Sequence, residues 1–403
     1  MSVNYQDDCI QIFCGDVRTA LERVGDQSVQ TCVTSPPYWG LRDYGTAQWE
    51  GGLDDCAHLA PPTGGTVKGS KLAGTGNREG FSADGQYKQQ CRKCGAQRVD
   101  QQIGLEPTPG AYVATLVAVF REVRRVLKND GTVWLNLGDS FWGSGKGLNG
   151  DGTHSSEHRT TDKQFTNKGS LKTKRGDYLS VGKECGLKPK DLVGIPWRVA
   201  FALQADGWYL RSDIIWSKPN AMPESVTDRP TKAHEYLFLL AKSARYYYDA
   251  KAIKEPGVGA DWRDGFRGEQ GAYVNQSRVQ NNTHKSDKQR GHGRRHAGLN
   301  DRWDSITKEE QCSGMTNKRD VWTIATQPYA EAHFATFPPK LIEPCILAGA
   351  PAGGVVLDPF HGAGTTAMVS KQLGRKYIGI ELNQAYIDLS LKRIQQEVLW
   401  LGP

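Results

Sequence analysis

The chain has 403 residues and a formal net charge of +7, from 51 lysines and arginines set against 44 aspartates and glutamates. This mild excess permits a polyanionic partner without requiring one. The longest apolar stretches, such as residues 112–120, fall far short of the roughly 20 residues needed to cross a bilayer, so the sequence excludes a helical membrane protein.

The first predicted element is a buried strand over residues 28–34, a run rich in β-branched side chains. It stops at Ser35-Pro36-Pro37-Tyr38, because proline cannot donate to a sheet and two prolines fix a rigid extended turn. Such a turn follows the carboxyl end of a strand, where open α/β sheets place their ligands. For an isolated tetrapeptide, a stiff surface turn that carries an aromatic side chain explains the same residues.

Helix and strand signals then alternate along the middle of the chain, as a parallel sheet requires. They comprise a helix over 112–127, a strand over 132–137, a helix over 191–205, and two strands within 207–220 and 229–240. Residues 143–186 and 258–319 interrupt this alternation with sequence rich in glycine, serine, asparagine and charge. Their basic runs at 163–175 and 285–295 fit a solvated loop and a DNA-binding loop alike, because flexible basic segments often order on a phosphate backbone.

A second motif lies near the carboxyl end of the chain. It consists of a predicted strand at 353–358, a turn containing Gly362 and Gly364, a helix at 365–373, and a strand at 377–381 that ends on Glu381. Nucleotide-type cofactors use this arrangement, and the final acid accepts hydrogen bonds from ribose hydroxyls. A nicotinamide-dependent enzyme is the rival interpretation. It is disfavoured because the third glycine of a dinucleotide fingerprint is missing and because Asp358 would repel a phosphate, whereas it suits the ammonium of a methionine moiety.

The Ser-Pro-Pro-Tyr turn followed later by Asp358-Pro-Phe-His-Gly-Ala-Gly-Thr-Thr resembles the amino-methylating DNA methyltransferases, in the permuted group whose catalytic tetrapeptide precedes the cofactor loop. This resemblance implies an α/β, Rossmann-like methyltransferase fold dependent on S-adenosylmethionine. It would have a mixed, mostly parallel sheet with helices on both faces, a circularly permuted motif order and loop-rich insertions. The implied function is site-specific methylation of the exocyclic amine of a flipped base in double-stranded DNA.

By this resemblance Ser35, Pro36, Pro37 and Tyr38 form the catalytic turn. An exocyclic amine is a poor nucleophile because its lone pair is delocalised into the ring. Hydrogen bonds accepted by the Ser35 hydroxyl and the Pro36 carbonyl would localise that lone pair, and Tyr38 would stack on the everted base. Serine before Pro-Pro-Tyr is the form associated with N4-cytosine methylation in this family, while N6-adenine methylation stays open. An inactive, zinc-bearing DNA-binding protein is the alternative from another class.

Further site residues follow from the resemblance, each with a structural alternative. The implied cofactor-binding residues are Asp16, Phe337, Pro338, Asp358, Phe360, Gly362, Gly364, Thr365 and Glu381. Helix capping explains Asp16 as well, and a hydrophobic helix entry explains Phe337 and Pro338. The implied contacts to DNA or the target base are Trp39, Trp216, Lys218 and Asn220. His234 fits either a catalytic base or a structural histidine that anchors the following strand.

Four potential soft metal ligands cluster in the sequence as Cys56-x-His58 and Cys91-x-x-Cys94, with a glycine after Cys94. Paired Cys-x-x-Cys with a trailing glycine is typical of a zinc knuckle, so we expect a structural zinc; free thiols on a loop are the alternative. A zinc would let an insertion with little apolar sequence fold without a core of its own.

The sequence predicts one catalytic core, assembled from residues 1–50, 104–142, 187–257 and 320–403. The predicted insertions are a zinc-knuckle segment at 51–103, a basic glycine-rich segment at 143–186 and a target-recognition region at 258–319. Nine cysteines, with no charged-then-apolar leader at the start, predict a reducing cytoplasm. The protein would be bacterial, or phage-encoded and active in the host cytoplasm. A cognate restriction endonuclease is a candidate partner.

Overall fold

The computed structural model describes residues 3–40, 46–53, 55–58, 90–142, 184–256, 315–327 and 336–398. The basic runs at 163–175 and 285–295, and most of the predicted target-recognition region, lie outside these residues. The chain forms two compact units, residues 1–247 with 320–403, and residues 248–319. In the second unit the described residues pair β9 (Glu255–Pro256) with β10 (Met315–Thr316). Within the described part of the chain, no helix has the length and apolar character to span a membrane.

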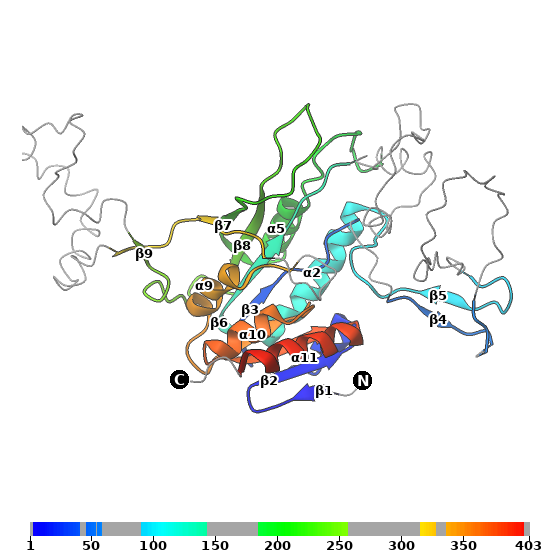
Figure 1. Cartoon of the computed structure of the whole chain (residues 1–403), viewed down its shortest axis with the longest axis horizontal. Coiled ribbons are helices and arrows are strands. Elements are labelled where there is room, and N and C mark those ends of the chain that lie inside the picture. The colour runs from blue at the N-terminus through cyan, green and yellow to red at the C-terminus, as the bar shows by residue number, and fades with distance from the viewer. Residues whose placement is uncertain are drawn as a thin grey trace, which may run out of the picture. The chain divides into compact units, whose positions relative to one another are not determined.

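The first unit contains a nine-stranded sheet in the order β1-β2-β13-β12-β3-β6-β8-β7-β11 (Figure 1). In chain order its strands are β1 (Val3–Gln6), β2 (Ile10–Cys14), β3 (Val29–Thr34), β6 (Leu127–Leu137), β7 (Tyr209–Ser217), β8 (His234–Ala241), β11 (Val321–Thr323), β12 (Val355–Asp358) and β13 (Lys376–Glu381). Five neighbouring pairs are parallel, and β1/β2, β6/β8 and β7/β8 are antiparallel. The sheet is therefore mixed and mostly parallel, which confirms the predicted fold class.

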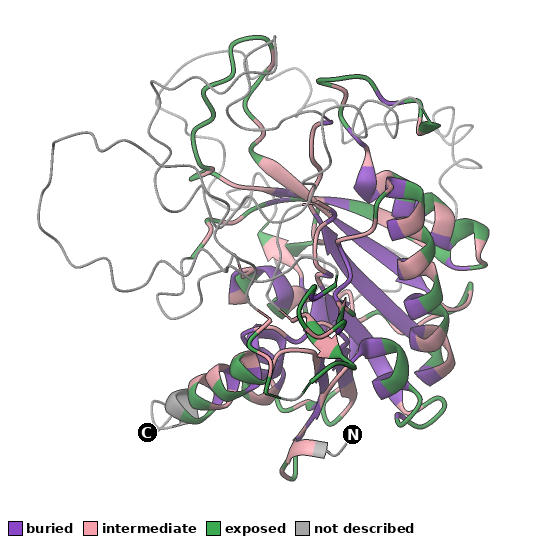
Figure 2. Ribbon diagram, turned by 90° about the vertical axis from the view of Figure 1, so that its right-hand side faces the viewer, coloured by how far each residue is buried: buried purple, intermediate pink, exposed green. Residues whose placement is uncertain are grey.

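Helices cover both faces of this sheet, and the strands between them are the most buried part of the unit, as Figure 2 shows. One face carries α1 (Val17–Leu21), α2 (Pro109–Val126) and α5 (Ile195–Ala205); the other carries α9 (Pro339–Gly349), α10 (Thr365–Gln372) and α11 (Gln384–Val398). All six residues of β3 are buried. This is the pattern of a parallel strand covered on both faces, and it explains why the strand reads as a continuous β-branched run.

The longest covering helix, α2, packs through an apolar stripe. Tyr112, Leu116, Phe120 and Val123 recur at helical spacing and are completely buried. Burying each such side chain contributes roughly 1.5–3 kcal/mol to folding. Thr108 caps the helix by accepting a hydrogen bond of 3.0 Å from the Ala111 amide. The predicted helix at 112–127 therefore exists and begins three residues earlier than expected, at Pro109.

Two element boundaries differ from the sequence prediction for tertiary reasons. The strand expected from residue 132 begins at Leu127, because Leu127 already pairs with Val29 of β3. The helix expected from residue 191 begins at Ile195, because Gly194 adopts a left-handed φ of 76°. The Asp139 carboxylate then accepts hydrogen bonds from the amides of Gly194 and Ile195, which caps the helix from a distant strand end.

Candidate active site

The carboxyl ends of β3 and β12 lie side by side and bring the two sequence motifs together. The strands pair in parallel through Cys32 and Leu357. Beyond this pair the Thr34 hydroxyl donates a hydrogen bond of 2.6 Å to Asp358 Oδ1, across 324 positions of sequence. Ser35 and the glycine loop therefore leave the same edge of the sheet from adjacent strands, the position where such sheets bind ligands.

The Asp358 carboxylate is occupied by donors from the protein itself. Besides Thr34, it accepts hydrogen bonds from the Phe360 amide at 3.1 Å and from the Thr366 hydroxyl at 2.7 Å. The residue is 1% exposed, and burial raises its pKa to about 6 in spite of these bonds. Asp358 thus braces the strand end, the loop and the start of α10, while its expected contact with the methionine ammonium stays a prediction.

The Glu381 carboxylate at the end of β13 holds the other side of the loop. It accepts hydrogen bonds from the Gly362 amide at 2.8 Å and from the Asn383 amide at 2.9 Å. Gly362 and Gly364 adopt left-handed φ values of 52° and 77°, which a larger residue would strain. Burial raises the pKa of Glu381 to about 7. Carboxylate oxygens have further lone pairs, so Glu381 keeps capacity to accept from a ribose hydroxyl.

Asp16, a predicted cofactor residue, lies next to Glu381 and also caps α1. The Gly15 amide donates to the Glu381 carbonyl at 2.9 Å, so the end of β2 adjoins the end of β13. The Asp16 carboxylate accepts from the Arg18 amide at 2.8 Å and forms an ion pair with the Arg18 side chain. The capping alternative therefore has structural support, and a contact from Asp16 to the cofactor stays a prediction.

The other predicted cofactor residues lie where α9 and α10 begin. Pro338 is the buried N-cap of α9, and Phe337, half-buried, precedes it. Thr365 is the first residue of α10, and its hydroxyl accepts from Arg393 at 2.9 Å. Phe360 packs against the same hydrophobic core that contacts Tyr38. Their contacts with the cofactor stay predictions.

His361 is a loop residue that the sequence prediction missed. It is 3% exposed, and its Nε2 and Nδ1 atoms each lie 2.7 Å from a hydroxyl, of Ser390 and Tyr377 respectively. The Ser390 hydroxyl donates to the Ile387 carbonyl at 2.8 Å, so it accepts from Nε2, and Tyr377 then donates to Nδ1. Burial lowers the pKa of His361 to about 3, which keeps the ring neutral. The only sequence signal was its place inside the Asp-Pro-Phe-x-Gly loop.

The catalytic turn is fixed from α2 and β6. The Tyr112 hydroxyl donates to the Pro37 carbonyl at 2.9 Å. The Tyr38 ring packs over Gly138, where an added Cβ would lie only 2.5 Å from Tyr38 Cε2. Ser35 is half-buried and Pro36 is buried. The turn is therefore held rigidly, and a residue larger than glycine at position 138 would displace the aromatic ring.

The phenol of Tyr38 contacts residues that the sequence prediction did not include. It donates to Glu235 Oε2 at 2.7 Å and lies 3.1 Å from Asn136 Oδ1. Burial and the neighbouring Glu235 carboxylate raise the pKa of Tyr38 well above its ordinary value, so the phenol keeps its proton. The available sequence signal for Glu235 was its position, a charged residue just before the apolar run of β8.

Comparison with known proteins identifies the family. A family model described as N6_N4_Mtase, DNA methylase, matches residues 29–392. The type II methyltransferase M.Cfr9I of Citrobacter freundii is 38% identical over 386 residues, covering 96% of this chain and 88% of that protein. The chain belongs to this family of DNA methylases. The type II methyltransferase M.SmaI of Serratia marcescens is also 38% identical, with 95% of this chain and 90% of that protein covered.

A solved structure titled PvuII DNA methyltransferase (cytosine-N4-specific) resembles the methylase with a TM-score of 0.49 and 14% identity, over 98% of this chain and 93% of that one. Membership of the family confirms the predicted resemblance and the activity. The protein is a DNA methyltransferase that uses S-adenosylmethionine and acts on DNA.

Trp39, predicted to contact DNA or the target base, is a buried residue of the methylase. It is 4% exposed, its indole donates to the Glu106 carbonyl at 2.8 Å, and its ring stacks on Trp142 with centroids 5.9 Å apart. This placement favours a packing role, in which Trp39 anchors the chain that follows the catalytic turn.

The remaining predicted DNA contacts lie at the end of β7. The Trp216 indole donates to the Ile324 carbonyl at 2.8 Å, and Asn220 exchanges two hydrogen bonds with the backbone of Thr326. Both therefore fasten the segment that contains β11. Lys218 pairs with Glu235, with its ammonium 4.2 Å from the centroid of the Trp216 ring. Contacts from these residues to DNA stay predictions.

The four predicted metal ligands converge near a two-stranded antiparallel sheet of the methylase, β4 (Gln48–Glu50) and β5 (Gln97–Val99), where Trp49 stacks on His58. Their ligand atoms all lie within 4.8 Å of one another. Cys56 Sγ is 3.8 Å from Cys91 Sγ, and Cys94 Sγ is 3.5 Å from His58 Nδ1. Tetrahedral zinc with ordinary bond lengths requires separations of about 3.8 Å and about 3.6 Å for these two kinds of pair. The residues present therefore fit a zinc ion.

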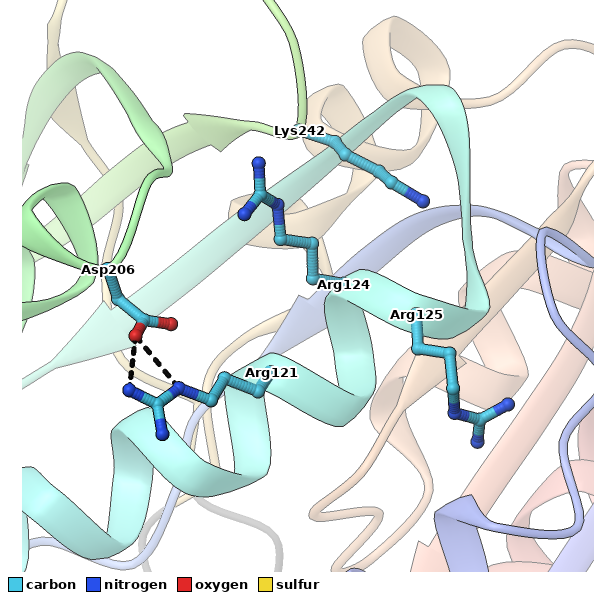
Figure 3. Close-up of a pocket in the computed structure, with 5 residues that line it drawn as sticks. All are labelled: Arg121, Arg124, Arg125, Asp206 and Lys242. Atoms are coloured by element: carbon cyan, nitrogen blue, oxygen red, sulfur yellow. Dashed lines mark hydrogen bonds and ion pairs between the residues drawn. The ribbon is translucent and has the colours of Figure 1, made fainter.

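A basic hollow of about 460 Å³ lies at the opposite edge of the sheet from the catalytic turn. Figure 3 shows its lining, which consists of Arg121, Arg124, Arg125, Asp206 and Lys242. Lys242 follows Ala241, which pairs with Thr132 of β6 and with Tyr209 at the start of β7, whereas the catalytic turn lies beside the carboxyl end of β6. The arginines belong to the last turns of α2, where cations stabilise the helix dipole. This hollow is separate from the candidate active site.

Proposed function

We propose that the methylase modifies N4 of cytosine, with N6 of adenine as the alternative base. The observation that carries the proposal is the hydrogen bond from Thr34 to Asp358, because it sets Ser35 directly beside the cofactor loop. In this family serine at that position is the form associated with cytosine. A single hydroxyl and a single carbonyl can polarise either amine, so base identity requires a direct measurement.

In this proposal the Ser35 hydroxyl and the Pro36 carbonyl accept hydrogen bonds from the target amine, and the Tyr38 ring stacks on the everted base. The cofactor, S-adenosylmethionine, supplies the methyl group when bound. Glu381, a half-buried residue at the end of β13, would accept hydrogen bonds from the ribose hydroxyls. Gly362 and Gly364 adopt left-handed φ values and carry no side chain at those two positions of the loop.

The decisive measurement is sequencing of methylated bases in DNA from cells that express the methylase and have no other DNA methylase. We expect N4-methylcytosine at one short recognition sequence. N6-methyladenine would select the alternative base, and unmodified DNA would contradict the proposed activity.

We also propose a structural zinc held by Cys56, His58, Cys91 and Cys94. Gly52 supports this assignment because its added Cβ would lie 2.7 Å from Cys94 Sγ, so the chain leaves space for the ligand cluster. Metal analysis should find about one zinc per chain, and Cys94→Ser should lose it. Cys9→Ser, at an exposed cysteine outside the cluster, should retain the metal. A reduced, metal-free sample with an unchanged melting curve would rule the zinc out.

We further propose that residues 258–319 read the DNA sequence, and that 1–50, 104–142, 187–257 and 320–403 form the catalytic core. Exchanging 258–319 for the matching segment of a relative should change the recognition sequence found by base sequencing. An unchanged sequence would place recognition elsewhere. The relatives are named type II methyltransferases, which supports a cognate restriction endonuclease as a partner. Cleavage of unmethylated but not methylated DNA by extracts of the source cells would test this partner.

A further inference from the structure

The backbone on both sides of Tyr38 is held in place. The carbonyl oxygen of Pro37, before it, accepts a hydrogen bond of 2.9 Å from the Tyr112 hydroxyl. Trp39, after it, is 4% exposed, and its indole donates to the Glu106 carbonyl. Because its neighbours are fixed, the Tyr38 ring can move only by rotation about its own side-chain bonds. The contacts of the ring and of the phenol therefore decide where this aromatic surface lies.

Two polar side chains and a glycine restrict that rotation. The Tyr38 phenol donates to Glu235 Oε2 at 2.7 Å and lies 3.1 Å from Asn136 Oδ1. The ring itself packs so closely on Gly138 that a Cβ added there would lie 2.5 Å from Tyr38 Cε2. The ring is thus held both at its edge and at its hydroxyl, and these contacts together define its tilt.

The two side chains at the phenol come from neighbouring strands. Asn136 of β6 pairs with Leu237 of β8, and Glu235 lies two residues before Leu237. Side chains two residues apart in a strand point to the same face, so Asn136 and Glu235 project from the sheet together. The Asn136 amide nitrogen donates to Glu235 Oε2 at 3.3 Å and to the Tyr236 carbonyl at 3.1 Å. These bonds keep both side chains beside the phenol.

Lys218 supports the Glu235 carboxylate from the end of β7. Its ammonium pairs with Oε1, whereas the Tyr38 phenol donates to the other oxygen, Oε2. Both charged side chains are only 17% exposed. A carboxylate this deep is costly unless it is hydrogen bonded, and the ammonium, the amide and the phenol together supply three donors. The ion pair at Oε1 therefore keeps Oε2 turned toward the phenol.

We propose that Asn136, Glu235 and Lys218 form a polar clamp on the Tyr38 phenol, which fixes the ring before DNA binds as the surface on which the everted base stacks. Glu235 is then a positioning residue for base eversion and acts through the phenol. A ring that is already fixed loses less conformational freedom when the base stacks on it, so a larger share of bound DNA holds its base everted. This inference rests on the proposed stacking role of Tyr38.

Base eversion can be measured separately from methyl transfer. The probe is a duplex with the recognition sequence found by base sequencing and 2-aminopurine next to the target base, because its fluorescence rises when its stacked neighbour leaves the helix. Tyr38→Phe keeps the ring and removes the hydroxyl. We expect it to lower the equilibrium constant for eversion about 3- to 10-fold, the scale of ordering one side chain. The Kd for S-adenosylmethionine should change less than about twofold, since Tyr38 is not part of the glycine loop.

Two substitutions at Glu235 separate its hydrogen bonding from its charge. Glu235→Ala removes the acceptor and should lower eversion as much as Tyr38→Phe does. Glu235→Gln keeps a polar group, because its amide oxygen can accept from Lys218 while its amide nitrogen donates to the phenol oxygen and the phenol hydrogen turns to Asn136. We expect Glu235→Gln to evert the base within about twofold of the parent protein. Equal losses in the two variants would overturn the proposal, because the carboxylate would then act through its charge.

A double-mutant cycle tests whether Glu235 acts through the phenol. With the phenol removed by Tyr38→Phe, Glu235→Ala should cause no further loss of eversion, and losses that multiply would contradict the clamp. Normal eversion by Tyr38→Phe would contradict it as well, even if Glu235→Ala failed to fold. Glu122→Ala is the control, since it removes a carboxylate paired with Arg125 at the basic hollow, and it should leave eversion unchanged.

Ser35→Ala separates the clamp from the proposed function. It should slow methyl transfer and leave eversion unchanged, because Ser35 is proposed to act on the amine once the base is everted. A mismatch opposite the target base lowers the cost of eversion, so it should restore transfer by Glu235→Ala and not by Ser35→Ala. If Tyr38→Phe everts the base normally while Ser35→Ala loses transfer, the clamp is rejected and the proposed function stands. If Ser35→Ala retains full transfer, the assignment of the catalytic turn is rejected.

Discussion

Replacing Ser35 by alanine is expected to lower the rate of methyl transfer by about 100-fold or more, the usual cost of removing one preorganised polar group from a reaction centre. Ser35 directly follows Thr34, whose hydroxyl donates a hydrogen bond to Asp358, so Ser35 lies at the edge of the sheet from which the cofactor loop leaves. Residual transfer is expected because the Pro36 carbonyl remains as an acceptor. The measurement is a single-turnover assay with labelled S-adenosylmethionine.

Cofactor binding separates a catalytic role for Ser35 from a structural one. The Kd for S-adenosylmethionine should stay within about twofold in Ser35→Ala, because the glycine loop and Glu381 are untouched. Ser28→Ala is the matched control, since Ser28 precedes the amino end of the same strand and its hydroxyl donates to the nearby Gly25 carbonyl at 2.7 Å. A parallel loss of cofactor affinity and rate would show that Ser35 supports the cofactor site instead.

The affinity for S-adenosylmethionine is expected to rise about tenfold between pH 6 and pH 8. Burial raises the pKa of Glu381 from 4.5 to about 7 in the free protein, so the carboxyl is largely protonated at pH 6. Ribose hydroxyls donate best to the ionised form, so the binding-competent fraction grows from about one-tenth to about nine-tenths across this range. The apparent Kd should fall in proportion, and binding should release a proton near neutral pH.

The raised pKa of Glu381 gives the stability of the cofactor-free protein the opposite pH dependence: stability falls as the pH rises. A raised pKa means that protonated Glu381 contributes stability below pH 4.5 that is lost as the pH rises through about 7. Glu381→Gln should bind the cofactor more weakly at pH 8 and lose this part of the pH dependence. Titration of the cofactor itself is common to both proteins, so the difference between their profiles isolates Glu381. Identical profiles would contradict its proposed role at the ribose.

Local chemistry made the two motifs readable from sequence. Proline pairs and spaced glycines constrain the backbone wherever they occur, so Ser35-Pro36-Pro37 and Gly362-x-Gly364 could be assigned to strand-end turns without coordinates. The four proposed metal ligands could be predicted for the same reason, because Cys91 and Cys94 have the spacing of a zinc knuckle. Such local patterns can be interpreted without knowing which residues pack against them in the folded protein.

The network around Tyr38 could not be predicted in this way. Glu235 and Asn136 come from β8 and β6, and only the antiparallel pairing of those strands brings both to the phenol. His361 was hidden similarly, since its two hydroxyl partners come from β13 and α11. The sequence around a polar residue in an apolar run does not show which residue of another element will be its hydrogen-bond partner.

The sequence by itself determined the order of the two motifs and so the family, and it predicted the catalytic turn, the cofactor loop and the proposed metal ligands. Only the tertiary structure showed which predicted residues hydrogen bond or pack within the protein itself, as Asp358 and Trp39 do. It also showed which unpredicted residues hold the catalytic turn in place. The physical reason is that backbone constraints are local, whereas the direction of a hydrogen bond and the burial of a charge depend on groups that the fold brings from distant parts of the chain.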